Sequence, residues 1–404
     1  MPYKELRKLY YGSEEEYKRI YEERYNASST IHMDFIVSKH DCFFTQDNEV
    51  IKLMSDILKL DKQIALLRKE MPGIALGQYS RKCLIDEIVL TNNIEGVHSS
   101  RKEIGNALAI LEDQSEKKGH KNRFLGMVNR YVKLMNYEEV KIDSCQDIRN
   151  IYDEIVLEEV LLEDKNNAPD GKIFRKEQTT IRSAADKPIH AGITPERRII
   201  ECMDKALNFL HDESIEKLYR ICLFHYLLEY IHPFYDGNGR LGRFILSYCI
   251  SETLESILAY RISETIKENI KWYNNSFEIC NDQKNMGDLT PFLIMMFTMI
   301  KTSEEELIAS LSRKQVSWDR YQKKIQEYCP DAVKKKGNFY NLLIQAALFS
   351  ELGISMEELT ENLKLSEGTV RKYINSAKEK DLIITHRESR QFYYMLNTDV
   401  LDLE

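Results

Sequence analysis

The chain has 404 residues, of which 43% are hydrophobic and 30% are charged, and its formal net charge is -8. This composition is typical of a soluble globular protein with more than one domain, and no run of about 18 apolar residues predicts a membrane-spanning helix. The net negative charge argues against a nucleic-acid-binding surface along the whole chain.

The N-terminal quarter is predicted to be helical. Apolar residues recur at helical spacing over 48–70, and a second helix is expected over 78–92. Ser100 and Glu103 form a capping-box pattern that opens a third helix. The first 45 residues give no functional signal, and because they begin without the apolar run of a signal peptide we expect a cytoplasmic protein.

The middle of the chain alternates helices with one segment of different character. Residues 171–194 contain Gly and Pro with β-prone residues, which favours a short hairpin or flap. Thr194 and Pro195 indicate the cap and the first residue of the helix that follows it. The helices expected in this part of the chain cover 121–137, 145–162, 195–211, 214–230, 240–257 and a stretch past Pro291 to 327.

The C-terminal part is predicted to be a separate module. Residues 330–337 have the composition of a linker, and the elements expected after them resemble a winged helix-turn-helix with a recognition helix over 366–374. Residues 337–404 contain seven basic and eleven acidic side chains. Because phosphate contact needs a basic face, this balance gives DNA binding little support and leaves protein contact or dimerisation open.

The most informative segment is HPFYDGNGRLGR, residues 232–243, which lies between two predicted helices. Gly237 and Gly239 lack a Cβ, so backbone N–H groups there can close on an anion, next to the N-terminus of the second helix. Arg240 and Arg243 are one turn apart on that helix, and both can reach phosphate oxygens. The segment therefore predicts a polyphosphate site.

Two more side chains of this segment add chemistry to the anion site. Asp236 is a hard oxygen ligand that suits Mg²⁺ bridging phosphates. His232 is a base that can be neutral at pH 7 and can take a proton from an attacking hydroxyl group. The segment thus combines a phosphate site with a general base and a metal ligand.

The run resembles, letter for letter, the signature H-P-F-x-[D/E]-G-N-G-R-x-x-R of the Fic family. The resemblance implies an all-helical core and transfer of AMP from Mg-ATP to a Ser, Thr or Tyr hydroxyl. It implies His232 as general base and Asp236 as magnesium ligand. Gly239 favours AMP transfer, because the phosphate-transferring branch of the family typically has Lys there. The nucleotide-binding residues that the resemblance implies are Gly237, Asn238, Gly239, Arg240 and Arg243.

An upstream segment resembles the inhibitory motif [S/T]-x-x-x-E-[G/N] of the same family. It runs from Thr91 through Glu95 to Gly96. The resemblance implies that Glu95 pairs with Arg243 and blocks placement of the γ-phosphate. One guanidinium cannot give its bidentate fork to a carboxylate and a phosphate together.

We therefore predict a mainly α protein with a Fic-type helical core, a short β-hairpin flap and a small C-terminal winged helix-turn-helix domain. The expected domains are an N-terminal helical region with the inhibitory motif over 1–115, a catalytic core over 116–328 and the winged-helix-like domain over 337–404. By the same resemblance, the flap at 171–194 would pair with an extended piece of the target protein.

The function expected from the resemblance is an autoinhibited protein adenylyltransferase that uses ATP and Mg²⁺. Its partners would be target proteins with a Ser, Thr or Tyr hydroxyl or the chain itself, and a homodimer would fit many relatives. Two alternatives stay open. One is AMP removal or another nucleotide transfer at the same site, and the other is a nucleotide-sensing DNA-binding regulator.

Overall fold

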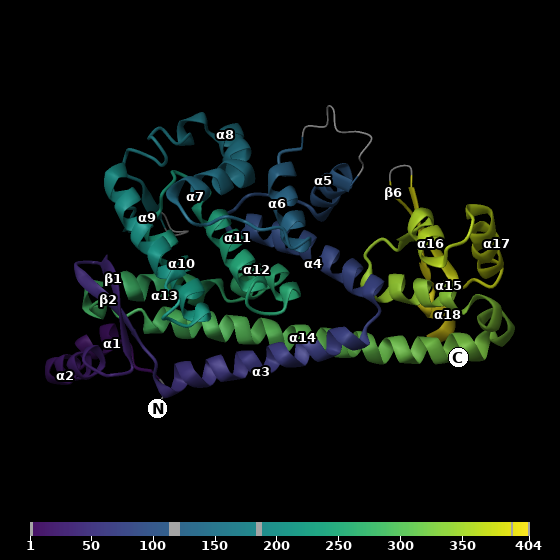
Figure 1. Cartoon of the computed structure of the whole chain (residues 1–404), viewed down its shortest axis with the longest axis horizontal. Coiled ribbons are helices and arrows are strands. Elements are labelled where there is room, and N and C mark those ends of the chain that lie inside the picture. Colours follow the sequence, from purple (N-terminus) through teal and green to yellow (C-terminus); the bar gives the residue numbers. More distant parts are fainter. Residues whose placement is uncertain (1–2, 113–121, 183–187, 389–390, 403–404) are drawn as a thin grey trace. The chain divides into compact units, whose positions relative to one another are not determined.

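The structure, a computed structural model of the chain, describes residues 3–112, 122–182, 188–388 and 391–402 (Figure 1). It is mainly helical with small sheets, which confirms the predicted fold class. The chain divides into two compact units, one made of residues 1–61 and 84–304 and the other of residues 62–83 and 305–404. The three-domain division stays a prediction. In the described ranges, no helix has the length and apolar character to cross a membrane.

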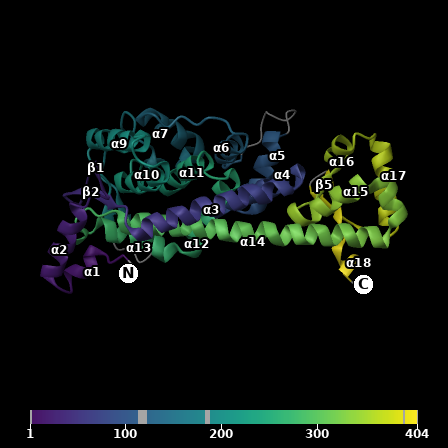
Figure 2. The same cartoon turned by 60° about the horizontal axis from the view of Figure 1, so that its bottom comes forward.

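The first unit is built around α10 (Lys217–Ile231), which packs between α9 (Glu196–His211) and α11 (Asn238–Ser251) (Figure 2). Most residues of α10 are buried, including the whole run 221–228, so buried side chains lie on all sides of this helix and it forms the centre of the core. The other helices of this unit are α1 (Leu6–Tyr10), α2 (Glu14–Tyr25), α5 (Arg101–Glu112), α6 (Leu125–Met135), α7 (Cys145–Tyr152), α8 (Glu158–Glu163), α12 (Ile262–Glu268) and α13 (Ile270–Asn281). A π-helical turn, Asp153–Leu157, joins α7 to α8.

The boundaries between the units fall within three long helices, α3 (Asn48–Glu70), α4 (Gly73–Ile94) and α14 (Thr290–Tyr328). Helix α3 has the predicted bounds, whereas α4 begins five residues earlier than the predicted 78–92 helix. The predicted capping box before α5 is confirmed, since Glu103 N–H donates to Ser100 Oγ and Ser100 N–H donates to Glu103 Oε2.

Two antiparallel hairpins belong to the first unit. Strands β1 (Thr30–Val37) and β2 (His40–Thr45) lie in the N-terminal region for which the sequence gave no prediction. Strands β3 (Thr180–Arg182) and β4 (Pro188–Ala191) confirm the short hairpin expected over 171–194. Residues 183–187 of that segment lie outside the described residues.

Two local predictions are wrong. Helix α9 begins at Glu196 with Pro195 as its N-cap, so Thr194 lies one residue before the cap. The Glu196 carboxylate accepts N–H groups of the loop at 172–174. The predicted linker over 330–337 lies in α15 (Pro330–Phe349), which has non-helical backbone at Lys336. Proline at the first position of a helix loses no hydrogen bond, so Pro330 starts this helix instead of marking a linker.

The second unit contains a small sheet in the order β5-β7-β6 with helices around it. The elements after α15 follow in the order expected from the sequence, and the capping box at Ser355 and Glu358 is confirmed. Assignment of this module as a winged helix stays a prediction. The elements are β5 (Ile354–Ser355), α16 (Met356–Leu363), α17 (Glu367–Lys378), β6 (Ile383–Glu388), β7 (Gln391–Leu396) and α18 (Thr398–Asp402).

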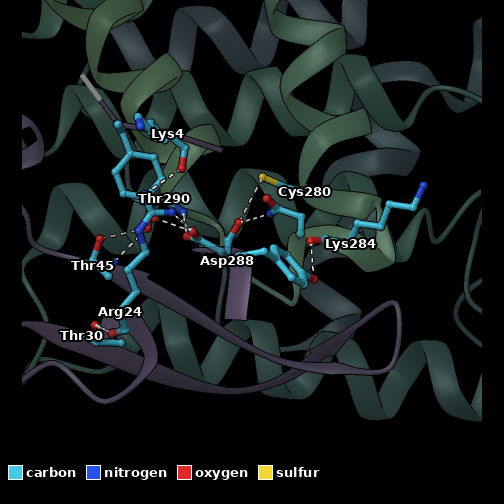
Figure 3. Close-up of polar contacts among 11 residues, drawn as sticks. Lys4, Arg24, Thr30, Thr45, Cys280, Lys284, Asp288 and Thr290 are labelled. Carbon is cyan, nitrogen blue, oxygen red and sulfur yellow. Dashed lines mark hydrogen bonds and ion pairs between the residues drawn. The ribbon is translucent and has the colours of Figure 1, made fainter. Parts of the chain in front are cut away.

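Within the first unit, a buried carboxylate attaches the N-terminal residues to the segment that precedes α14 (Figure 3). Asp288 is fully buried, and its Oδ2 lies 3.3 Å from Nη1 of Arg24 on α2 and accepts the hydroxyl of Tyr3. The Arg24 guanidinium also lies 3.8 Å from the centre of the Tyr3 ring and donates to Lys4 O. The other Asp288 oxygen accepts the N–H of Thr290 at 3.0 Å.

This cluster predicts a large effect of Asp288→Ala on stability. The substitution removes the acceptor for three donors and leaves Arg24 without its carboxylate, so we expect a loss of about 3 kcal/mol in the free energy of unfolding. Urea titration followed by circular dichroism measures this loss. Asp282→Ala is the matched control, since Asp282 only caps a short 3-10 turn and its removal should cost about 1 kcal/mol. Equal losses in the two variants would contradict the assignment.

Candidate active site

The loop between α10 and α11 has a fixed backbone. His232 has a left-handed conformation (φ 52°) and ends α10, and Gly237 has φ 81° and caps α11. Asn238 locks the loop, because its side-chain amide both accepts the N–H of Phe234 and donates to Phe234 O at 3.0 and 2.9 Å. A side chain at Gly237 would press against Val156 of the π-helical turn. The loop therefore presents the N-terminus of α11 in one orientation.

The N-terminus of α11 meets the end of α4 at Arg243. This arginine is 1% exposed, and its Nη2 lies 2.7 Å from Glu95 Oε1. Its Nε and Nη2 also donate to the hydroxyl and the carbonyl of Thr91 at 2.8 and 3.0 Å. The structure thus brings together Thr91, Glu95 and Arg243, the three residues that the sequence related only by resemblance.

Glu95 follows the last residue of α4, where the chain turns through Gly96 (φ 76°). Its carboxylate lies so close to Gly239 that a Cβ there would collide with it. Because the first N–H groups of a helix have no partner within that helix, the start of α11 is a place for an anion. The Glu95 carboxylate lies at this place and contacts Arg243 as well.

Arg240, the first arginine of the signature, has a different carboxylate partner, which the sequence reasoning missed. Arg240 and Glu159 are both almost fully buried and form an ion pair through Nη1 and Oε2. Glu159 follows Ile155 by four residues and Val156 by three, so helical spacing puts it on the apolar face. This spacing was the available signal, and it separates Glu159 from its exposed neighbour Glu158.

Asp236 is partly exposed beside the start of α11, and its Oδ1 accepts the N–H of Gly237. A carboxylate has a second oxygen, which fits the role of a single protein ligand to Mg²⁺, because this ion commonly takes one or two carboxylates together with substrate phosphates. Among the described residues, no group of three or more His, Cys, Asp or Glu side chains is arranged to hold a metal on its own. A magnesium ion here would therefore depend on phosphate oxygens for further ligands.

Burial is the main cause of the pKa shifts of two side chains in the site, His232 and Glu229. Burial is the main cause that lowers the pKa of His232, to about 4, and the charge of Arg175 lowers it further. His232 is therefore neutral at pH 7, the state that can accept a proton. Burial also raises the pKa of Glu229, which faces Arg243, to about 8. At pH 7 Glu229 is thus mainly protonated.

The flap is held next to this loop. His190 on β4 donates its Nε2–H to Tyr230 O at 2.8 Å, and its ring stacks on the Tyr230 ring with 4.4 Å between the ring centres. Glu196 accepts three consecutive backbone N–H groups at 172–174, which fixes the approach to the flap. The hairpin thus lies within contact of the residues that precede His232.

Comparison with known proteins gives one family match. Residues 143–250, which include the whole loop and both of its arginines, match the family model described as Fic/DOC family. The chain is 33% identical over 99 residues to a probable protein adenylyltransferase of Aquifex aeolicus, a match that covers 24% of this chain and 29% of that protein. It is 28% identical over 156 residues to the protein adenylyltransferase fic-1 of Caenorhabditis elegans, covering 37% of this chain and 28% of the relative.

The fold is similar to that of a solved structure. A crystal structure of a Fic family protein from Desulfovibrio desulfuricans covers 87% of this chain and 97% of its own, with a TM-score of 0.53 and 21% identity. At this identity the likeness shows the fold alone. The chain spans less than a third of the length of the two curated relatives named above.

The buried pair of Glu159 and Arg240 predicts an asymmetry between neighbouring glutamates. Glu159→Ala leaves the buried Arg240 charge without a partner and should lower the free energy of unfolding by about 3–5 kcal/mol. Glu158→Ala, one residue away on the exposed face, should change it by less than about 0.5 kcal/mol. Guanidinium titrations of both variants test this expectation, and a Glu159→Ala variant as stable as Glu158→Ala would disprove the pair.

Proposed function

Because residues 143–250 are a Fic domain, we propose that this protein is a protein adenylyltransferase, which moves AMP from Mg-ATP to a hydroxyl side chain of a target protein or of itself. The observation that carries the proposal is the loop from His232 to Arg243. It joins a neutral, half-buried histidine, a helix N-terminus and two buried arginines in one short segment. The names of the relatives agree with this activity.

In the proposed reaction, the phosphate chain of ATP lies along the N-terminus of α11. The N–H groups of the first turn and the Arg243 guanidinium bind its oxygens. Asp236 would hold Mg²⁺, which neutralises phosphate charge when bound. His232 takes the proton of the target hydroxyl while the hydroxyl oxygen attacks the α-phosphorus of ATP. The bond from the α-phosphorus to the bridging oxygen breaks, and pyrophosphate leaves.

The contact between Glu95 and Arg243 supports an autoinhibited resting state. The carboxylate lies 2.7 Å from Nη2 of Arg243 and against Gly239, the position where the phosphate chain would bind. Two anions repel one another at this distance, and one guanidinium cannot serve both. In the proposal, productive ATP binding requires Glu95 to leave.

The flap supports a protein as the acceptor. Strands β3 and β4 form an isolated two-stranded sheet, so among the described elements each strand has a free edge to which an extended chain could pair. The hairpin also lies beside Tyr230, two residues before His232. A target strand bound at this edge would bring its hydroxyl close to the proposed base.

His232→Ala tests the base. Since general-base catalysis contributes about two to four powers of ten, the variant should lose that much transfer rate. Transfer is measured with ATP labelled on the α-phosphate, by the label that becomes bound to protein in a lysate or to the chain itself. Unchanged transfer would contradict the assignment of His232. Label from the γ-phosphate but not from the α-phosphate would contradict AMP transfer altogether.

Glu95→Gly tests the inhibition. Losing a hydrogen bond to a charged group costs about 1.5–3 kcal/mol, so freeing Arg243 for phosphate should raise transfer by roughly ten- to 150-fold. Glu95→Gln should raise it too, because it removes the charge but keeps the size. Asn93→Gly is the matched control, since it loosens the same helix end without touching Arg243. A rise with Asn93→Gly as large as with Glu95→Gly would assign the effect to the loosened helix instead of to the carboxylate.

A further inference from the structure

Arg175 lies immediately before the flap and has none of its surface exposed to solvent. Among the residues that the structure describes, no carboxylate forms an ion pair with it. Its guanidinium instead donates to three backbone carbonyls, those of His232 at 2.9 Å, Glu177 at 2.5 Å and Ile193 at 2.9 Å. A buried cation that contacts only carbonyl groups is costly, so the arrangement calls for a reason beyond packing.

The three carbonyls belong to different parts of the site. Glu177 precedes β3 and Ile193 follows β4, so Arg175 holds both ends of the flap. His232 is the residue proposed as base, and its left-handed backbone is sparsely populated for residues other than glycine. The backbone N–H of Arg175 also donates to Pro233 O at 3.2 Å, so the backbone and the side chain of Arg175 both bind the turn at 232–233.

Gly192 fits this arrangement. A Cβ at Gly192 would collide with Nη2 of Arg175 and lie 3.1 Å from the His232 Cβ. The Gly192 and Ile193 N–H groups donate to Thr179 O and to Ile231 O at 3.0 and 3.1 Å. The absence of a side chain at 192 thus lets the guanidinium pass between the flap and the end of α10.

We propose that Arg175 is a positioning residue that joins the flap and the proposed catalytic base into one rigid piece. Its fork fixes the carbonyl of His232 and both ends of the hairpin at once. A target strand paired to the flap then has a fixed position relative to the histidine, which is how the site would aim one hydroxyl at the base. This role rests on the proposed function, since it takes His232 as the base and the flap as the target site.

The test uses the full chain without nucleotide, so that it does not depend on AMP transfer. Arg175→Met removes charge and fork, Arg175→Lys keeps the charge and loses the fork, and Gly192→Ala displaces the guanidinium while Arg175 stays in place. Arg220→Met is the matched control, because Arg220 also donates to a backbone carbonyl, that of Leu210, between α9 and α10.

The first readout is hydrogen exchange at the Gly192 and Ile193 amides. We expect it to become about ten- to 100-fold faster in all three test variants, since each loses charged hydrogen bonds that hold the end of the flap. Arg220→Met should leave these amides unchanged. If Arg175→Met and Gly192→Ala both exchange like the unaltered chain there, or exchange faster equally throughout α10 and α11, the proposal is overturned.

The second readout is the titration of the His232 ring by NMR, with the ring signal identified among the nine histidines by His232→Ala. Arg175, His190 and Glu95 are the titratable groups that act on this ring. A positive neighbour disfavours the imidazolium, so Arg175→Met should raise the pKa of His232 by about one unit. Arg175→Lys should leave it nearly unchanged. A pKa that does not move in Arg175→Met would contradict a guanidinium held against His232.

AMP transfer by Glu95→Gly, measured in parallel, separates the two proposals. Transfer without any effect of Arg175 on exchange or titration would leave the function standing and remove the positioning role. If the variants show the expected exchange and titration effects but no AMP transfer is detected, both the proposed function and the role of Arg175 in catalysis are contradicted.

Discussion

The buried charge of Arg243 is the constraint on which the rest of the site depends. A guanidinium that is 1% exposed must be compensated, because an unpaired buried charge costs several kcal/mol. Compensation comes from Glu95 and Thr91 at the end of α4, which are far from Arg243 in sequence. The end of α4 must therefore lie against the start of α11, and Gly239 must lack a side chain to let the carboxylate in. The buried charge of Arg243 thus fixes the contact between the end of α4 and residues 143–250, the segment that matches the family model.

Among the residues that the structure describes, the three largest fully buried side chains are arginines of this site, and each is compensated in a different way. Arg243 contacts a partly exposed carboxylate and Arg240 a fully buried one, whereas Arg175 contacts carbonyl groups and no carboxylate in the part of the chain that the structure describes. An exposed partner can be exchanged, whereas a buried partner cannot leave without a large cost. This ordering matches the proposed function, in which Arg243 changes its partner during the cycle and Arg175 keeps its partners throughout.

Much of this could be predicted from the sequence, for physical reasons that differ between residues. The start of α11 and the anion site proposed there are encoded locally, by two glycines and a helix start, and α3 has a clear apolar period. The pairing of Glu95 with Arg243 came only from a resemblance, because no local rule relates residues 148 positions apart. Arg175 and Glu229 gave no signal, since their roles arise from long-range packing. The helical structure of residues 330–337 was not predicted, because a run of lysines has the composition of a linker. Its helical structure depends on the packing of α15 within the second unit.

The position of Glu95 explains why, in the proposed function, a phosphate chain can replace its carboxylate at Arg243. It lies beyond the last turn of α4, where Gly96 allows the chain to turn, and its side chain is 31% exposed. A carboxylate that leaves such a place regains water, so its departure costs little provided that another anion takes over Arg243. A phosphate chain does this with more negative charge and more acceptors. In the proposed function, the stability of the last turn of α4 therefore contributes to the balance between the two anions at Arg243. A partner that unwinds residues 91–96 would shift this balance toward ATP without touching the loop at all.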